Sequence, residues 1–522
     1  MSNYKRRVGE VRPSQLLYTY GIGAIVDLPE FSVLVMGLDD WSYSTTNHDP
    51  DLTNNIEEER LLAAVRTRGP LATVQRLLAP PVGKSSGSPM DPDSELDLVG
   101  VQVATFPRWL VCPTCRLLAS IDSGHFELKA PRWRSNRAYY VHRYCTNDKV
   151  KEPTAIPARF LVACENGHLD DFPWIEFVHS NQKPCSPAPR LSLIEQGPSG
   201  EARDLLVRCH GCNAERRLAE AFGRQNREKM PFCTARRPHL RDYDPKGCEN
   251  RYIPGQPLRM RPLVLGASNT WFPLIMSSIA IPGATTKIDQ IVAEDWATIQ
   301  AITALSIIPA FRAIGQLGRL SAYSDDDIWA AIQRRQQPDD EAQGDNPLDL
   351  KLPEWQVFTQ FNPDLNSDDF RLRPTVVPLA YTDWLDQVIL VEKLREVQVL
   401  TGFTRLDSPG EVLEMGDAES TSQIVPLTRK EPTWLPAAEV RGEGIFLHFN
   451  EARVQRWLRT VSRRGAEFHQ AHMRWRSARF IANPEEHDPG MRYVLLHSFA
   501  HALMRQMAME SGYTAASVRE RI

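Results

Sequence analysis

The sequence lacks the features that assign many proteins to a class from composition alone. Nowhere in its 522 residues is there an uninterrupted apolar run of the roughly 20 residues that a bilayer crossing needs. The opening residues, MSNYKRRVGEVRPSQ, contain no apolar core of a secretory signal. Neither acid nor base dominates, because the net charge is −4 and the pI is near 6.4. We therefore expect a cytoplasmic protein with no membrane partner, and any nucleic acid must be bound by a local basic patch.

One motif of a common enzyme class is also missing. There is no Gly-x-x-x-x-Gly-Lys-Ser/Thr loop, with which an autonomous ATPase would bind phosphates. Hydrophobic residues make up 42% and charged residues 24%, close to globular averages. The length predicts a chain of about two to four domains with a sizeable core.

Cysteine, by contrast, is present and unevenly distributed. All nine cysteines lie between Cys112 and Cys248. In a chain without a secretory signal, clustered cysteines favour metal ligands over disulfides. We expect the region to bind about two structural zinc ions, which would stabilise a segment too rich in loops to hold a core alone.

Ligand spacing predicts two zinc sites. The first joins two pairs with knuckle spacing, Cys112-Pro-Thr-Cys115 and His142-Arg-Tyr-Cys145, an arrangement typical of a zinc ribbon. The second starts from Cys209-His-Gly-Cys212 and needs two single cysteines downstream, which could also be ordinary buried thiols. Because four protein ligands leave no position for water, both sites should be structural. The predicted ligands of the second site are Cys209, Cys212, Cys233 and Cys248.

Further residues of ligand type leave a third site open. Cys164 and His168 could supply two ligands, with Cys185 and His179 completing the set. Cys164 could equally replace His142 in the first site.

Helical spacing of apolar residues follows the cysteine-rich region. It predicts helices over residues 286–335 and 381–400, after a capping Asn450, and over 493–507. The expected fold class is α+β and multidomain, with a cysteine-rich zinc-binding insertion and a largely helical C-terminal half. The expected domains are an N-terminal α+β domain (1–105), the zinc-binding region (106–251) and a mostly helical central domain (252–480).

A histidine pair supplies an alternative function. His497 and His501 are four residues apart, the helical spacing that binds zinc in metalloproteases, but Ser498 stands where the general-base Glu should follow. A packed or hydrogen-bonded pair is the simpler interpretation. The alternative is a metal-dependent hydrolase or nuclease that uses this pair with nearby acids.

Arginine and tryptophan are interleaved near the C-terminus. Guanidinium groups pair with phosphates and aromatic rings stack on unpaired bases, so such a segment is a candidate DNA surface, whereas a solvated face with buried tryptophan is the alternative. The predicted DNA-binding residues are Arg456, Arg459, Arg463, Arg464, Arg474, Trp475, Arg476 and Arg479.

Four stretches of the sequence resemble one family. They are RPSQLLYTYGIGAIVDLPEFSVLVMGLDDW (12–41), PARFLVACENGHLDDFPWIEFVH (157–179), LGASNTWFPLIMSSIAIP (265–282) and LREVQVLTGFTRLD (394–407). Together they resemble DrmB, a component of the bacterial DISARM anti-phage system. The stretch YVLLHSFAHALMRQMAMESGY (493–513) is similar to the start of a domain found beside or fused to superfamily 2 helicases.

The resemblance implies a non-catalytic accessory subunit. DrmB-like proteins accompany DrmA, a helicase-like ATPase, so the implied role is to bind a DrmA-like ATPase in a heteromeric complex and to contribute to DNA binding. No catalytic or cofactor-binding residue is then expected in this chain. The resemblance also implies that residues 481–522 begin a helicase-associated domain that is incomplete here, and that His142 stands where relatives more often have cysteine.

Overall fold

The computed structural model divides the chain into two compact units. The first comprises Met1–Ser277 and Val397–Glu439, and the second comprises Ser278–Glu396 and Val440–Ile522. The residues that the structure describes are 8–43, 54–81, 99–131, 137–146, 150–180, 182–197, 201–250, 255–282, 291–292, 295–320, 323–336, 349–408, 423–478, 483–485, 488–512, 514 and 517–522.

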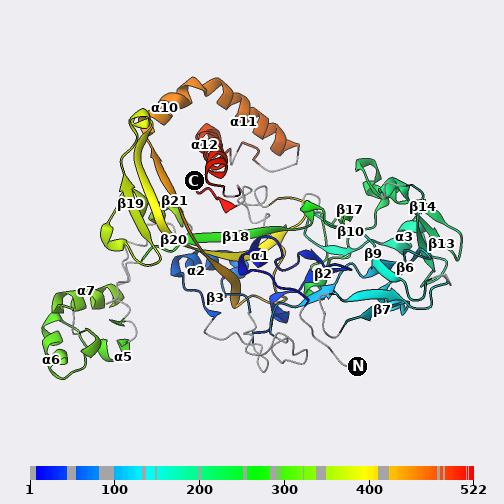
Figure 1. Cartoon of the computed structure of the whole chain (residues 1–522), viewed down its shortest axis with the longest axis horizontal. Coiled ribbons are helices and arrows are strands. Elements are labelled where there is room, and N and C mark those ends of the chain that lie inside the picture. The colour runs from blue at the N-terminus through cyan, green and yellow to red at the C-terminus, as the bar shows by residue number, and fades with distance from the viewer. Residues whose placement is uncertain are drawn as a thin grey trace. The chain divides into compact units, whose positions relative to one another are not determined.

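An eight-stranded antiparallel sheet organises the cysteine-rich part of the first unit (Figure 1). Tight turns join the strands of its hairpins, and several of these turns contain cysteine. The order is β14 (Glu215–Arg217), β13 (Leu205–Cys209), β12 (Leu191–Glu195), β6 (Leu117–Ser120), β5 (Trp109–Val111), β9 (Thr154–Pro157), β8 (Tyr139–His142) and β7 (Phe126–Lys129).

Smaller sheets and short helices complete the first unit. One sheet has the order β1 (Ile25–Asp27), β2 (Ser32–Val35), β4 (Val103–Thr105), another β11 (Leu169–Asp171), β10 (Phe160–Ala163), β17 (Arg261–Val264), and β15 (Arg236–Arg237) pairs with β16 (Asp242–Tyr243). The helices are α1 (Pro13–Tyr18), α2 (Glu59–Arg66) and α3 (Trp174–Val178). Aromatic residues of α3 and its approach, among them Phe172, Trp174 and Phe177, are buried in one core with β10, β12 and β13.

The segment expected to be a helix over residues 381–400 is a strand instead. β20 (Leu385–Thr404) is 20 residues long and is flanked by β18 (Phe272–Ile279) and β21 (Trp434–Phe449), with β19 (Arg371–Thr375) also paired to it and β3 (Arg76–Leu78) next to β21. Val388–Val391 are four apolar residues in succession and residues 397–404 are buried on both faces, so neither stretch shows the strict alternation of a half-buried strand. The expectation of a largely helical C-terminal half was therefore wrong. The signal that favours a strand is β-branched composition, from Val388, Ile389, Val391, Val397 and Val399.

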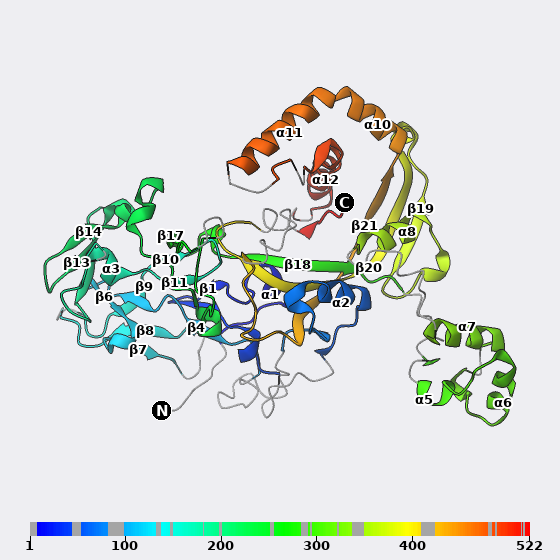
Figure 2. The same ribbon diagram turned by 180° about the vertical axis from the view of Figure 1, so that it is seen from behind.

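Other predicted helices are present in the second unit. α5 (Trp296–Ile299), α6 (Ile308–Ala313) and α7 (Asp325–Gln336) pack around a shared core that includes Ile299, Ile308 and Ile328 (Figure 2). The Asn450 side chain accepts from the Arg453 N–H at 3.0 Å and caps α10 (Glu451–Thr460) as expected. The remaining helices are α8 (Lys351–Thr359), α11 (Ser462–Ser477) and α12 (Gly490–Ser511). Within the described residues, none of the helices is both long enough and apolar enough to cross a bilayer.

One buried arginine joins distant stretches of the first unit. Arg405 is 1% exposed, and its guanidinium donates to the carbonyls of Gly23 (2.8 Å), Gly167 (3.1 Å) and Thr270 (2.5 Å). Burial lowers the pKa of Arg405 to about 9. The Phe403 ring lies 4.8 Å from the guanidinium and occupies the space that a Cβ on Gly23, at φ 78°, would need. A glycine is therefore required where the backbone approaches this ring.

We predict that Arg405→Met lowers the free energy of unfolding of the first unit by about 3–5 kcal/mol, because three buried carbonyls lose their donor. Urea unfolding followed by tryptophan fluorescence measures this change. The matched control is Arg203→Met, since Arg203 is 70% exposed and pairs with Glu201, and it should change stability by less than about 0.5 kcal/mol. Equal unfolding midpoints for the two variants would contradict the role of Arg405.

Candidate metal centres

Three groups of four cysteine and histidine side chains converge among the described residues of the first unit. Each group brings three sulfurs and one imidazole nitrogen within 4.8 Å of one another. A tetrahedral zinc ion, with Zn–S near 2.3 Å and Zn–N near 2.0–2.1 Å, separates two sulfurs by about 3.8 Å and sulfur from nitrogen by about 3.6 Å. Those two spacings are the test that each group must meet.

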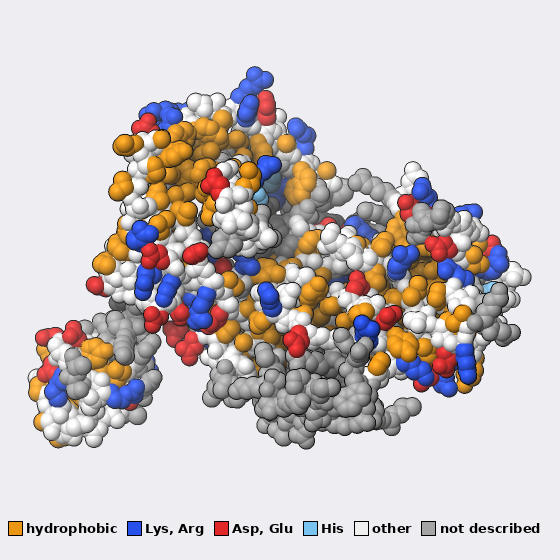
Figure 3. Space-filling view, viewed as in Figure 1, with side chains coloured by type: hydrophobic (Ala, Val, Ile, Leu, Met, Phe, Trp, Pro, Cys, Tyr) orange, Lys and Arg blue, Asp and Glu red, His pale blue; other side chains and the backbone are white. Residues whose placement is uncertain are grey.

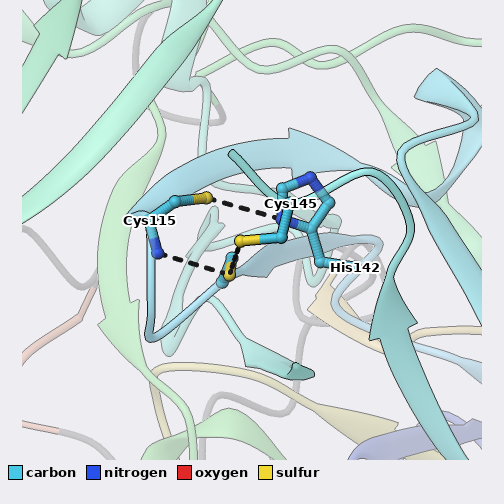
Figure 4. Close-up of side chains that lie close together, drawn as sticks. Cys115, His142 and Cys145 are labelled. Carbon is cyan, nitrogen blue, oxygen red and sulfur yellow. Dashed lines mark hydrogen bonds between the residues drawn. The ribbon is translucent and has the colours of Figure 1, made fainter. Parts of the chain in front are cut away.

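The first group contains the four ligands predicted for the first site. Cys112 follows β5 directly, and a turn with Arg116 in the left-handed region (φ 64°) leads into β6. Cys112 Sγ lies 3.9 Å from Cys145 Sγ, and Cys115 Sγ lies 3.4 Å from His142 Nδ1 (Figure 4). Both distances agree with a shared zinc ion. Cys164, the alternative to His142, belongs to a different group.

The second group consists of Cys164, His168, Cys233 and Cys248. A turn after β10, with Gly167 at φ 77°, returns the chain so that Cys164 Sγ lies 3.3 Å from His168 Nδ1. Cys164 Sγ lies 3.7 Å from Cys248 Sγ, and Cys233 Sγ lies 3.6 Å from His168 Nδ1. This group also has the spacings of a tetrahedral zinc site.

The His168 ring is oriented by a carboxylate that the sequence did not reveal. His168 Nε2 lies 3.4 Å from Asp244 Oδ2, and Arg237 in turn pairs with Asp244. Donation from Nε2 to the carboxylate leaves Nδ1 free of a proton and facing the sulfurs. This is the arrangement that histidine ligands of zinc generally have.

The third group consists of His179, Cys185, Cys209 and Cys212. His179 follows α3, and its Nδ1 donates to the Ile175 carbonyl at 2.7 Å, which leaves Nε2 at 3.4 Å from Cys212 Sγ. Cys185 Sγ lies 3.5 Å from Cys209 Sγ. This histidine therefore offers the opposite nitrogen from His168, and here too the other nitrogen is fixed by a hydrogen bond.

The turn of the third group has no room for a larger residue at Gly211. A Cβ at that position would lie 2.9 Å from Cys185 Sγ. The glycine within the Cys209-His-Gly-Cys212 pair therefore allows Cys185 to approach, a role that knuckle spacing alone does not indicate.

The structure does not bring together the four cysteines predicted for the second site. Cys209 and Cys212 belong to the third group, whereas Cys233 and Cys248 belong to the second. Along the chain the third group is nested between the two halves of the second, so residues of ligand type that are neighbours in sequence belong to different groups. The residues left open for one further site are likewise divided, with Cys164 and His168 in one group and His179 and Cys185 in the other.

In the first and second groups, burial and neighbouring thiols keep one cysteine protonated, which a bound dication would reverse. Hydrogen bonds with Cys233 and Cys248, together with burial, raise the pKa of the Cys164 thiol well above its ordinary value. Burial raises the pKa of Cys115 to about 11. Zinc binds thiolates, and a bound dication removes the repulsion that keeps clustered thiols protonated. The donor sets are thus consistent with zinc at three sites rather than about two.

The predicted DNA-binding residues lie on two consecutive helices, apart from Arg479, which lies outside the described residues. Arg456 and Arg459 are exposed on α10, and Arg463, Arg464 and Arg474 are exposed on α11. Trp475 is half-buried, with its ring 6.2 Å from that of His472. Arg476 is 1% exposed and does not belong to a solvent-facing surface, because its side chain points into the protein.

The histidine pair of the alternative function lies on α12, and the two imidazole rings are in contact, with centroids 4.4 Å apart. The structure adds a third residue of ligand type, Glu520, which sequence reasoning missed because it lies beyond the end of the helix.

Residues 12–272, half of the chain, match a family described as a domain of unknown function, DUF8724. The chain belongs to the DUF8724 family. All three Cys/His groups lie inside the matched residues. The chain is also 29% identical, over 385 residues, to the DISARM protein DrmB of Bacillus paralicheniformis. That alignment covers 70% of this chain and 64% of DrmB, so the chain spans less than two thirds of the relative's length. The resemblance to DrmB is confirmed.

We predict that the grouping of ligands is visible in the zinc content of variants. Cys209→Ser and Cys233→Ser should each lower the content from about three ions per chain to about two, and the double variant to about one, because the two cysteines serve different ions. Inductively coupled plasma mass spectrometry measures this. If the zinc content of the double variant were no lower than that of either single variant, the two cysteines would share a site. His210→Ala is the control, since His210 lies between two ligands but hydrogen-bonds Ser192, and should keep all three.

Proposed function

We propose that this protein is a non-catalytic subunit of an anti-phage defence complex of the DISARM type, which binds a helicase-like ATPase and contributes to DNA binding. The observation that carries the proposal is the alignment with the DISARM protein DrmB over 70% of the chain. The remaining support comes from three features of the described residues: the chemistry of the Cys/His groups, an apolar surface and an arginine-rich pair of helices.

The Cys/His groups support a structural role for the metal. Each offers four protein ligands, so a tetrahedral ion held by them keeps no position for water or substrate. Such sites contribute folding energy rather than a nucleophile. This is the composition expected of a subunit that supplies surface while its partner supplies ATP hydrolysis.

An apolar surface in the second unit supports a protein partner. α12 is 22 residues long and contains three leucines and four methionines, yet none of its described residues is fully buried. Met509 on this helix is 72% exposed, and Ile445 on β21 is 44% exposed. Figure 3 shows hydrophobic side chains gathered over the region of β19, β20 and β21. Exposed apolar side chains gathered in this way are typical of a protein–protein interface.

The arginines of α10 and α11 support the DNA-binding part of the proposal. Five of them are exposed, and Arg463 is paired with Glu467 across one helical turn. Exposed ion pairs of that kind are weak, so the guanidinium can exchange the glutamate for a phosphate at little cost.

The partner surface generates one prediction. The isolated chain should hydrolyse no ATP, and mixed with the DrmA-like ATPase of the same system, the chain should co-elute as a stable complex. Ile445→Glu and Met509→Glu should each weaken that complex at least about tenfold, because a charge would be buried against an apolar partner. Binding is measured by interferometry with immobilised ATPase. Leu128→Glu, an equally exposed position on β7 of the first unit, is the control and should bind as the native chain does. ATP turnover that persists through repurification would defeat the accessory role.

The arginine surface generates another prediction. Replacing Arg459, Arg463, Arg464 and Arg474 with alanine should weaken DNA binding by the assembled complex and flatten its salt dependence. The log–log slope should fall by up to about one unit for each phosphate that the variant no longer binds. Fluorescence anisotropy across a salt series measures this. A double variant of Arg373 and Arg441, which are exposed and ion-paired on β19 and β21, controls for the removal of positive charge. If the salt slope of DNA binding were unchanged in the quadruple variant, DNA would bind to another surface of the protein.

A further inference from the structure

The end of the described chain returns to the side of α12 and stays there through contacts of its own. Gly512, at φ 75°, ends the helix, and in Figures 1 and 2 the C-terminal segment lies beside α12. Arg521 pairs with Glu354 and Glu396, and Arg519 also pairs with Glu396. These ion pairs hold the segment in place independently of the helix it faces.

Between the two arginines, Glu520 contacts the histidines of α12 instead. Glu520 Oε1 lies 2.5 Å from His497 Nδ1, and His497 stacks against the Tyr493 ring at 5.3 Å. His501 is one helical turn further along the same face, with its ring centroid 4.4 Å from that of His497. One ligand atom from each of the three residues lies within 4.8 Å of the others.

Two of these three side chains, those of Glu520 and His501, have a possible ligand atom that makes no hydrogen bond with any described residue. Glu520 Oε2 is shielded from solvent and accepts no hydrogen bond from any described residue. A buried carboxylate oxygen without a partner is costly, and such atoms are rare unless a water or an ion occupies the gap. Within the described residues, the ring nitrogens of His501 likewise make no hydrogen bond, although the ring lies against His497.

We propose that His497, His501 and Glu520 form a fourth metal site, which binds a divalent transition-metal ion such as Zn²⁺. Two imidazoles and one carboxylate are a donor set for zinc, and a tetrahedral ion needs its nitrogen and oxygen ligands about 3.4 Å apart. His497 Nδ1 and Glu520 Oε1 lie 2.5 Å apart, so they have to separate by about 0.9 Å to share an ion, and the exposed His501 side chain can turn toward them. Unlike the Cys/His groups, this site has three protein ligands, so one coordination position stays open to water or another oxygen ligand. The ion joins the C-terminal segment to α12.

A two-residue pair in the same unit provides a matched control. His469 and Asp488 are 2.6 Å apart, with side-chain exposures of 40% and 21%. His497 and Glu520 are 2.5 Å apart, with exposures of 40% and 24%. The two pairs thus match in contact and exposure, but among the described residues only the second has a third ligand in reach.

The test is Zn²⁺ uptake by the full-length protein whose three Cys/His groups are already filled with zinc. Isothermal titration should show one further ion bound per chain, which brief dialysis against EDTA removes while the other zinc remains. His501→Ala and Glu520→Gln should each weaken this uptake by at least about tenfold, and His469→Ala should leave it unchanged. His501 is exposed, so its removal should not alter the melting temperature, and that variant decides the test if Glu520→Gln unfolds.

Three outcomes would overturn the proposal. The native protein could take up no further zinc, His501→Ala could bind it as tightly as the native chain, or uptake could be abolished in His469→Ala instead. None of these results bears on the proposed accessory function, which depends on partner and DNA binding.

Discussion

The buried guanidinium of Arg405 is the contact on which the arrangement of the first unit depends. It belongs to the stretch 394–407 and donates to carbonyls in the other three stretches that resemble DrmB, 12–41, 157–179 and 265–282. Three backbone carbonyls satisfy its N–H groups but supply no full negative charge. Three thiolates and one imidazole would leave one negative charge in excess around a bound Zn²⁺. A filled second group would therefore place negative charge on Cys164, whose electrostatic interaction raises the pKa of Arg405 against the effect of burial.

The metal sites also show how far the sequence alone can specify which ligands share a site. The first site could be predicted, because its four ligands form two knuckles on adjacent hairpins, close in sequence and in space. The other two sites could not, because one is nested inside the other and spacing alone joins Cys212 to Cys233 across the boundary. Only the fold reveals that α3 carries His179 to one group of ligands while the turn after β10 carries His168 to another.

A similar limit applies to the secondary structure. The cap at Asn450 and the helix that follows were predictable, since a local hydrogen bond and an amphipathic face specify both. β20 was not, because full burial of residues 397–404 removes the alternation that identifies a strand. The role of Arg476 was equally invisible: its neighbour Arg474 faces solvent, while Arg476 is enclosed by packing that no local pattern records. Burial of a charge is a property of the tertiary structure.

Nesting of the metal ligands imposes an order of assembly on the chain as it is synthesised. The ligands of the first group are complete once Cys145 has emerged, and those of the third once Cys212 has emerged, whereas the second must wait for Cys248. Until then Cys164 and His168 are a half-site, open to any thiol that arrives first, including those of the Cys209–Cys212 pair. Closing the inner group first shortens the loop that the outer group has to close and so lowers its entropic cost. Vectorial synthesis from the N-terminus thus completes the third group before the second.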